Sequence, residues 1–269
     1  MAEKIKLYDD SKCTACRGCQ LACKQWNALT ASQTENRGTY QNPPSLAPNT
    51  FMLIHFQDYV DDKGNIKWLF RKEACMHCTD AACVTVCPSG ALYYNKETKT
   101  VGLDHEKCIG CKECVAACPF EIPRYDAKTD KVYKCDMCQS RITSNLEPAC
   151  VKACPTGALK WGLKETILKT AAKRAKDLGG DATTYGDKYV GGTHFMYVLK
   201  EKPAIYADIH KDPSVPWSVT IWKGWLKPLS LLAAGGVLGG AFFHYMIHGP
   251  KTPDAPNDGN DAGTTEGGK

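Results

Sequence analysis

The chain has 269 residues, with 34 Lys and Arg against 29 Asp and Glu and a formal net charge of +5. The basic residues are scattered and form no Lys/Arg-rich block, which argues against a nucleic-acid-binding surface. Sixteen cysteines are too many for an ordinary soluble domain, so their spacing is the main guide to function.

The cysteines form four groups of four, and none is left over. The groups are Cys13, Cys16, Cys19 and Cys23; Cys75, Cys78, Cys83 and Cys87; Cys108, Cys111, Cys114 and Cys118; and Cys135, Cys138, Cys150 and Cys154. Disulfide frameworks are typical of short secreted chains. Here the N-terminus, MAEKIKLYDD, is charged and has no apolar signal region, and cysteines two residues apart would close strained loops. We therefore do not expect disulfides.

The first and third groups have the unbroken spacing C-x2-C-x2-C-x3-C, which bacterial ferredoxins use for [4Fe–4S] clusters. Zinc sites built from four cysteines more often use two separated C-x2-C pairs. In three of the four groups a proline directly follows the last cysteine: Cys87-Pro88, Cys118-Pro119 and Cys154-Pro155. The spacing favours iron–sulfur clusters over zinc. In two-cluster ferredoxins the fourth cysteine of a run ligates the other cluster, so four runs predict two two-cluster modules.

Between the first two groups, residues 27–49 are rich in Asn, Gln, Ser, Thr and Pro, which predicts an irregular surface insertion. The stretch FMLIHFQDYVDDKGNIKWLF (residues 51–70) has two apolar runs around a turn-rich break and predicts a β-hairpin. ALYYNKETKTVGLD (residues 91–104) predicts a second hairpin. The repeat CPSGAL (87–92) and CPTGAL (154–159) indicates, in each copy, a short helix ended by proline, then a turn and a strand.

After the last group, KETILKTAAKRAKDLGG (residues 164–180) has the period of an amphipathic packing helix that Gly179 and Gly180 can end. Its predicted apolar face consists of Ile167, Leu168, Ala171, Ala172, Ala175 and Leu178. GGTHFMYVL (residues 191–199) predicts a strand.

Residues 228–247, PLSLLAAGGVLGGAFFHYMI, contain no charged side chain. Twenty helical residues span about 30 Å, the hydrocarbon thickness of a bilayer. Trp222 and Trp225 before this stretch and Tyr245 near its end are typical interface anchors. A buried core helix is the alternative, and the length and flanking aromatic residues favour a single membrane span. The tail from Pro250 to Lys269 has no core-forming residues, so we expect it to be disordered.

Other cofactor motifs are absent from the sequence, which has no GxGxxG, no GxxxxGK[ST] and no CxxCH. Two further residues lie within cysteine runs. His77 is a metal ligand by type, but the full set of cysteines leaves it no vacancy. Lys112 either raises a cluster potential through its charge or is an ordinary solvated lysine.

Several of these stretches together resemble a known family. They are the four cysteine runs, CKQWN (23–27), RKEACMHC (71–78), VYKCDMCQSR (132–141), EPACVKACPTGA (147–158), GGTHFMYVL, and WKGWLKPL (222–229) before an apolar span containing FHY (243–245). The chain resembles the iron–sulfur (beta) subunit of membrane-bound respiratory formate dehydrogenase. The cysteine runs alone are shared by many four-cluster subunits of molybdenum or tungsten enzymes, whereas the C-terminal combination is more specific.

The resemblance implies four [4Fe–4S] clusters that pair the first run with the fourth and the second with the third. Their implied ligands are Cys13, Cys16, Cys19 and Cys154 for cluster 1; Cys135, Cys138, Cys150 and Cys23 for cluster 2; Cys75, Cys78, Cys83 and Cys118 for cluster 3; and Cys108, Cys111, Cys114 and Cys87 for cluster 4. No catalytic residue is expected in a subunit of this kind. His244, costly in lipid, is expected to contact a haem-bearing partner subunit.

The expected fold class is α+β, with two ferredoxin-like modules, β-hairpin insertions and one C-terminal transmembrane helix. The expected domains are an outer module from the first and fourth runs (1–68 and 135–163), an inner module from the second and third runs (69–134), an extension and linker (164–221), the transmembrane helix (222–248) and a disordered tail (249–269).

The resemblance also implies a function for the chain and partners for it. Electrons pass from a molybdenum- or tungsten-pterin alpha subunit that oxidises formate, through the outer module first, and leave cluster 4 for haem b of a cytochrome b gamma subunit and the quinone pool of anaerobic respiration. An oligomer of such heterotrimers is expected in the bacterial inner membrane. The alternative is the same electron-transfer role in a hydrogenase or sulfur-compound reductase complex.

Two arguments about the membrane side disagree. Lys211, Lys223 and Lys227 precede the apolar span and Lys251 follows it, which by the positive-inside rule keeps the cluster domain in the cytoplasm. The resemblance places the cluster domain on the periplasmic face and the C-terminal tail in the cytoplasm. Because large folded domains weaken the charge rule, we expect the periplasmic arrangement.

Overall fold

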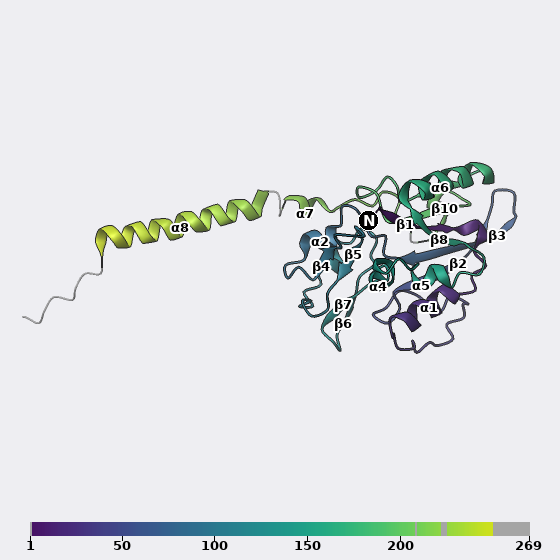
Figure 1. The fold of residues 1–269 in the computed structure, drawn as a ribbon, viewed down its shortest axis with the longest axis horizontal. Coiled ribbons are helices and arrows are strands. Elements are labelled where there is room, and N and C mark those ends of the chain that lie inside the picture. Colours follow the sequence, from purple (N-terminus) through teal and green to yellow (C-terminus); the bar gives the residue numbers. More distant parts are fainter. Residues whose placement is uncertain (1, 208, 222–224, 250–269) are drawn as a thin grey trace, which may run out of the picture. The chain divides into compact units, whose positions relative to one another are not determined.

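The computed structural model describes residues 2–207, 209–221 and 225–249, and divides the chain into two units, Met1–Thr220 and Ile221–Lys269 (Figure 1). The predicted disordered tail and the anchor residue Trp222 lie outside the described residues. The first unit mixes short helices and strands, and the second contains one long helix, α8 (Lys227–His248).

A four-stranded sheet joins distant parts of the chain in the order β8 (Leu159–Leu163), β1 (Lys4–Asp9), β10 (Phe195–Leu199) and β9 (Thr183–Tyr185). β1 pairs in parallel with β10, and both outer strands are antiparallel to their neighbours. The predicted strand in residues 191–199 is therefore confirmed. Because β9 and β10 come from the predicted extension, that extension shares a sheet with the N-terminal strand. The finer predicted domain boundaries stay a prediction.

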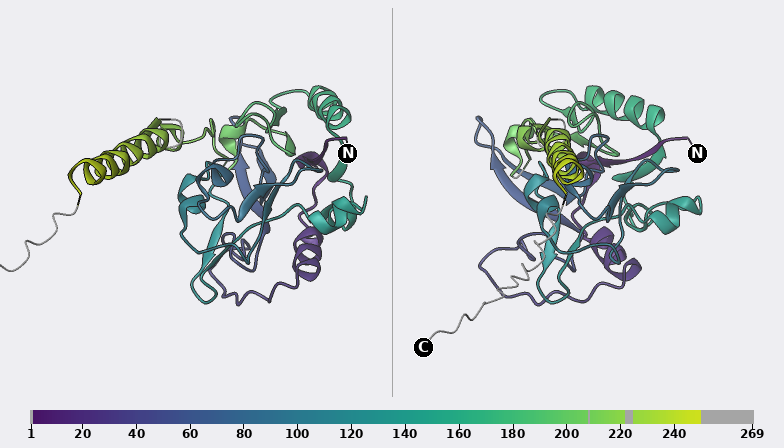
Figure 2. Two further views of the ribbon diagram at one scale, coloured as in Figure 1. Left: turned by 60° about the vertical axis from the view of Figure 1, so that its left-hand side comes forward. Right: turned by 90° about the vertical axis from the view of Figure 1, so that its left-hand side faces the viewer.

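Both faces of this sheet are covered, and the alternation of side chains along β1 and β10 separates them. On one face, Ile5, Leu7, Met196 and Val198 pack against α6 (Lys164–Leu178). Figure 2 shows this helix in green near the top of both views. The opposite face carries the side chains of the larger core: Tyr8, Phe195, Tyr197 and Leu199. Lys6 alternates onto that second face too.

The predicted helix α6 forms and ends at Gly179, whose φ of +66° suits glycine. Ile167 and Ala171 are buried, and Leu168, Ala175 and Leu178 are partly buried against the sheet. Ala172 is exposed, so its assignment to the apolar face is wrong. Successive helical residues are rotated by about 100°, so Ala172 lies outside the narrow apolar stripe that contains Ala171.

Three two-stranded hairpins complete the strands. β2 (Met52–Val60) pairs with β3 (Ile66–Ala74) and β4 (Leu92–Tyr94) with β5 (Val101–Leu103), which confirms both predicted hairpins. β6 (Arg124–Asp126) and β7 (Lys131–Tyr133) form a third, which the sequence analysis did not predict. No helix or strand occurs in residues 27–49, as expected for an irregular insertion.

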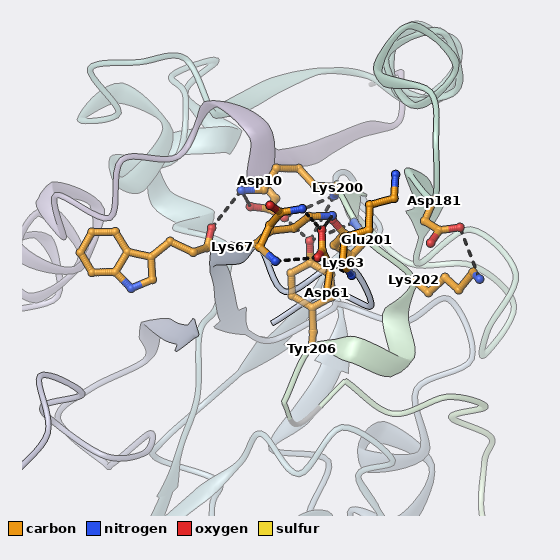
Figure 3. Close-up of polar contacts among 11 residues, drawn as sticks. Asp10, Asp61, Lys63, Lys67, Asp181, Lys200, Glu201, Lys202 and Tyr206 are labelled. Carbon is orange, nitrogen blue, oxygen red and sulfur yellow. Dashed lines mark hydrogen bonds and ion pairs between the residues drawn. The ribbon is translucent and has the colours of Figure 1, made fainter. Parts of the chain in front are cut away.

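A polar network fastens the β2–β3 hairpin to the segment after β10 (Figure 3). Lys67 of β3 pairs with Glu201 at 2.6 Å, and Lys200 pairs with the fully buried Asp10 at 3.6 Å. The Tyr206 hydroxyl donates to the same Asp10 carboxylate. Asp10 lies in η1 (Asp10–Lys12), directly before the first cysteine, so the network fixes the start of the first cysteine run. A second short 3-10 helix, η2 (Pro203–Ile205), leads into Tyr206.

The remaining helices carry the cysteines or precede the long helix. They are α1 (Gly18–Trp26), α2 (Ala82–Val86), α3 (Glu113–Ala117), α4 (Gln139–Thr143), α5 (Ala149–Lys152) and α7 (Trp217–Ile221). Val219 of α7 packs with Ala82 of α2 and Ala117 of α3, which directly precede Cys83 and Cys118 in the sequence.

Candidate functional site

The third cysteine of each run lies on a short helix, and proline decides how far that helix continues. α2 and α3 end directly before Cys87 and Cys118, each of which precedes a proline. α1, whose last cysteine has no proline after it, runs on through Cys23 to Trp26. A proline cannot continue the hydrogen-bonded ladder, so in three runs the fourth cysteine stands just beyond a helix end.

The loops that carry the cysteines turn tightly, because several of their residues have left-handed backbone conformations. Residues that directly precede or interrupt these helices have positive φ, among them Arg17 (58°), Lys112 (63°) and Cys138 (52°). Backbone amides point at sulfur: the amide of Ala15 donates to Cys13 Sγ and that of Met137 to Cys135 Sγ, both at 3.4 Å. Amide donors of this kind stabilise thiolate over thiol.

The sixteen cysteines line four cavities, four to each. The lining sets are set 1, Cys13, Cys16, Cys19 and Cys154; set 2, Cys23, Cys135, Cys138 and Cys150; set 3, Cys75, Cys78, Cys83 and Cys118; and set 4, Cys87, Cys108, Cys111 and Cys114. The four cavities are similar in size, which fits four copies of one object.

Each set takes three cysteines from one run and one from another. The crossing follows from helix packing, since α1 lies against α5 and α2 against α3. Each pair thereby brings the fourth cysteine of one run, which lies on α1 or just beyond the end of α2, α3 or α5, to the cavity of the partner's run. The four sets contain the same residues as the four ligand groups implied by the resemblance to the known family.

The sets form a row from 1 to 4, because cysteines of adjacent sets interact electrostatically. After burial, which is the largest cause, Cys150 of set 2 contributes to raising the pKa of Cys19 of set 1. Cys114 of set 4 acts in the same way on the pKa of Cys83 of set 3.

The link between sets 2 and 3 runs through Cys135. Burial raises the pKa of Cys135 most, and Cys75 of set 3 adds to the rise. The row is therefore continuous, from set 1 through sets 2 and 3 to set 4.

The cysteines are most exposed at the two ends of this row. Cys16 of set 1 and Cys111 of set 4 are exposed, whereas sets 2 and 3 contain no exposed cysteine. A row of redox centres whose end members are more accessible than its middle members is suited to accepting an electron at one surface and delivering it at another.

The donor chemistry fits iron–sulfur clusters. All sixteen cysteines are free. Burial raises the pKa of Cys19, Cys83, Cys114 and Cys138 to about 12 and that of Cys118 to about 11, so without metal these buried thiols keep their protons. Coordination by iron removes the proton and supplies the opposing charge.

A single zinc ion fits the geometry less well. Tetrahedral zinc requires four sulfur atoms at about 2.3 Å from one point. In the part of the chain that the structure describes, no group of three or more His, Cys, Asp or Glu side chains is placed to hold one metal ion. The cysteines are spread around cavities instead, as the corners of a larger cluster require.

His77 lines none of the four cavities. It is fully buried, and its Nδ1 accepts a hydrogen bond from the Val101 amide at 3.2 Å. Lys112 lines the set 4 cavity, but its Nζ lies 4.0 Å from the centre of the Tyr125 ring. The structure thus gives His77 a role in packing the second run against β5.

A larger cavity of about 350 Å³ has no cysteine in its wall. Its polar lining includes Arg71, Arg124, and His55 paired with Glu73 at 2.5 Å. Since it offers no thiolate, it is separate from the row of cysteine sets.

Family models match most of the chain. Two models described as 4Fe-4S dicluster domains match residues 66–164 and 12–91, and one described as formate dehydrogenase N, transmembrane, matches residues 215–257. The nitrate-inducible formate dehydrogenase iron–sulfur subunit of Escherichia coli K12 is 40% identical over 93% of this chain and 86% of its own length. The formate dehydrogenase iron–sulfur subunit of Haemophilus influenzae is 39% identical over 95% and 84%. The chain belongs to the family of formate dehydrogenase iron–sulfur subunits.

A more distant relative is the hydrogenase-2 operon protein HybA of Escherichia coli O157:H7, 29% identical over 86% of this chain and 82% of its own.

As a formate dehydrogenase iron–sulfur subunit, the chain is an electron-transfer protein with two ferredoxin-like dicluster domains and four [4Fe–4S] clusters. It is anchored by a single C-terminal span, since α8 contains an apolar stretch from Pro228 to His248 and the transmembrane family model covers it. The predicted fold class, cofactors and anchor are thereby confirmed. Sequence reasoning missed the buried lysines Lys6, Lys72 and Lys134, because nothing in a single strand sequence marks a lysine as buried.

Proposed function

We propose that this chain conducts electrons from a formate-oxidising catalytic subunit to a cytochrome b subunit in the membrane and then to quinone. The row of four cysteine sets with exposed members only at its ends supports the proposal most. We further propose that each set ligates one cluster, so that electrons enter at set 1 and leave from set 4.

The catalytic partner is tested by purifying the chain with its native complex and identifying the large subunit. The proposal expects a molybdenum- or tungsten-pterin subunit and cluster reduction on addition of formate. The similarity to HybA supports a second candidate, the same electron-transfer role in a hydrogenase complex. A co-purifying hydrogenase large subunit, with clusters reduced by hydrogen and not by formate, would favour that candidate.

We propose that the cluster domain lies on the periplasmic face and the C-terminus in the cytoplasm. A reporter protein fused after Lys269 should then be active only if it functions in the cytoplasm, because α8 is long enough to cross the bilayer once. A second fusion of the same reporters, at the N-terminus, serves as the control for the opposite side. Periplasmic activity of the C-terminal fusion would reverse this assignment.

We also propose that α8 lies against the membrane partner through Gly236 and Gly240. A Cβ atom at either position would have no neighbouring atom of this chain within 4 Å, so larger side chains would not clash within the chain. His244 lies one further turn along and stacks on His248 with ring centres 4.4 Å apart, and a polar ring in lipid favours contact with protein. Small residues at this spacing allow close approach of a second helix.

Replacing both glycines, Gly236→Leu with Gly240→Leu, should therefore loosen the complex and leave all four clusters intact. The measurement is recovery of the cytochrome subunit on affinity purification, together with the iron content of this chain. Val237→Leu, on the same exposed helix, is the matched control. Undiminished recovery of the cytochrome subunit with the double variant would show that the glycines make no such contact.

A further inference from the structure

Two fully buried lysines lie beside one cysteine cavity. Lys6 of β1 is 1% exposed and Lys72 of β3 is 0% exposed, and both line the cavity of set 2. Their ammonium nitrogens lie 4.3 Å and 5.0 Å from the centre of the Phe195 ring. The fold therefore places two cations on one phenyl ring, on the sheet face opposite α6.

One carboxylate, Asp136, lines the same cavity, and its Oδ1 accepts a hydrogen bond from the Cys138 amide at 2.8 Å. In the described part of the chain neither lysine takes part in an ion pair, and the Nζ of Lys72 has no hydrogen-bond partner. A buried cation without an anion is strongly destabilising, and two such cations also repel each other. The phenyl ring offsets part of this cost, but an aromatic face is a weak substitute for a counter-ion.

Both lysines face the cysteines of set 2, because all four of these cysteines line the same cavity. The wall of this cavity carries the four sulfur atoms of Cys23, Cys135, Cys138 and Cys150. Among the residues that line it, the cationic ones are Lys6 and Lys72. Both lysines thus act on sulfur atoms that are proposed to hold one cluster.

We propose that Lys6 and Lys72 are the built-in counter-charges of the cluster in set 2 and raise its reduction potential. Reduction adds one electron, and hence one negative charge, to a cluster that already carries the charge of four thiolates. Burial alone disfavours this added negative charge, whereas two fixed cations stabilise it. The lysines therefore raise the reduction potential of the cluster. The electron comes from the cluster of set 1 and passes on to that of set 3, and no proton is required.

Lys134, a third buried lysine beside a cysteine cavity, is held in place differently. It is also fully buried and lines the set 3 cavity, but its Nζ donates to the carbonyl oxygens of Val101 at 2.8 Å and Cys135 at 3.0 Å. Its ammonium group is thus held by backbone. Lys72 has no such bonds, so a neutral side chain of similar length can replace it without orphaning a backbone carbonyl.

The experiment is a redox titration of Lys72→Met in the complete complex, with each cluster followed by EPR. The signal of the set 2 cluster is identified as the one that Cys138→Ala removes. We expect its reduction equilibrium constant to fall at least tenfold, about 59 mV for one electron. The other three potentials should move less, and Lys72→Arg should restore the original value.

Lys152→Met is the matched control, because Lys152 lies on α5 two residues after Cys150 but is exposed and screened by water. An unchanged set 2 potential in Lys72→Met, or an equal fall in Lys152→Met, would overturn the proposal. If Lys72→Met does not assemble its clusters, Lys6→Met is titrated with the same expectation and the same overturning result. The inference rests on the proposed ligand set but not on the catalytic partner, whose identity leaves these potentials unaffected.

Discussion

Cys118→Ala should remove the cluster that contains Cys75, Cys78 and Cys83, although Cys118 belongs to a different run. α3 ends at Ala117, and Cys118 follows in an extended conformation directly before Pro119. This places the thiol in the set 3 cavity and away from the loop of its own run. Loss of one thiolate ligand leaves a cubane with an open iron, so we expect complete loss of the native EPR signal or conversion to a three-iron signal.

Cys111→Ala is the matched variant, because Cys111 lies in the same run but in the set 4 cavity. It should abolish a different signal, with a different midpoint potential, and leave the set 3 cluster intact. Loss of the same signal in both variants would mean that each run folds around its own cluster.

A chain that ends at Thr220 should leave the membrane with its four clusters in place. Every cysteine, and every residue lining the four cavities, lies in the unit Met1–Thr220. The apolar part of α8 is removed, and with it the stretch long enough to span a bilayer. In cells that lack the partner subunits, we expect the shortened chain in the salt-washed soluble fraction, and the full chain only in detergent extracts.

A chain ending at Gly249 keeps α8 and is the control, which should stay with the membrane. Continued membrane attachment of the chain ending at Thr220 would show that the cluster domain itself binds lipid. Loss of iron from that chain would show that α8 contributes to cluster retention.

Local patterns in the sequence predicted the elements whose partners are close along the chain. Both hairpins with a turn-rich break between apolar runs formed, and so did the helix that ends at Gly179. The hairpin β6–β7 was missed because its strands have only three residues each, too few to show a period of two.

Long-range pairing was beyond a single sequence. The parallel pairing of β1 with β10 joins residues about 190 positions apart, and nothing local in either strand specifies the other. The burial of Lys6 follows from that pairing, because its neighbours Ile5 and Leu7 face α6 and leave Lys6 toward set 2. The alternation Lys-Ile-Lys-Leu is typical of a strand with one face exposed to solvent. In the structure, both faces of this strand are covered by other parts of the chain.

The ligand groups came from the resemblance to the family, and the spacing alone left open which runs pair. The packing of α1 against α5 and of α2 against α3 supplies a physical reason for the crossing. Iron itself was predictable from the spacing, because three thiolates at x2, x2 intervals wrap a compact cluster and a helix carries the fourth away.

The central claim is that a row of clusters carries electrons from formate to quinone. Its most direct test uses the complex with Cys111→Ala, which should lack the last cluster. Formate is added without oxygen, and freeze-quenched samples are measured by EPR while quinone reduction is assayed in parallel. The account predicts that formate still reduces the clusters of sets 1, 2 and 3 and that quinone reduction falls to background. Quinone reduction at the rate of the unaltered complex, or three clusters that dithionite reduces and formate does not, would contradict it.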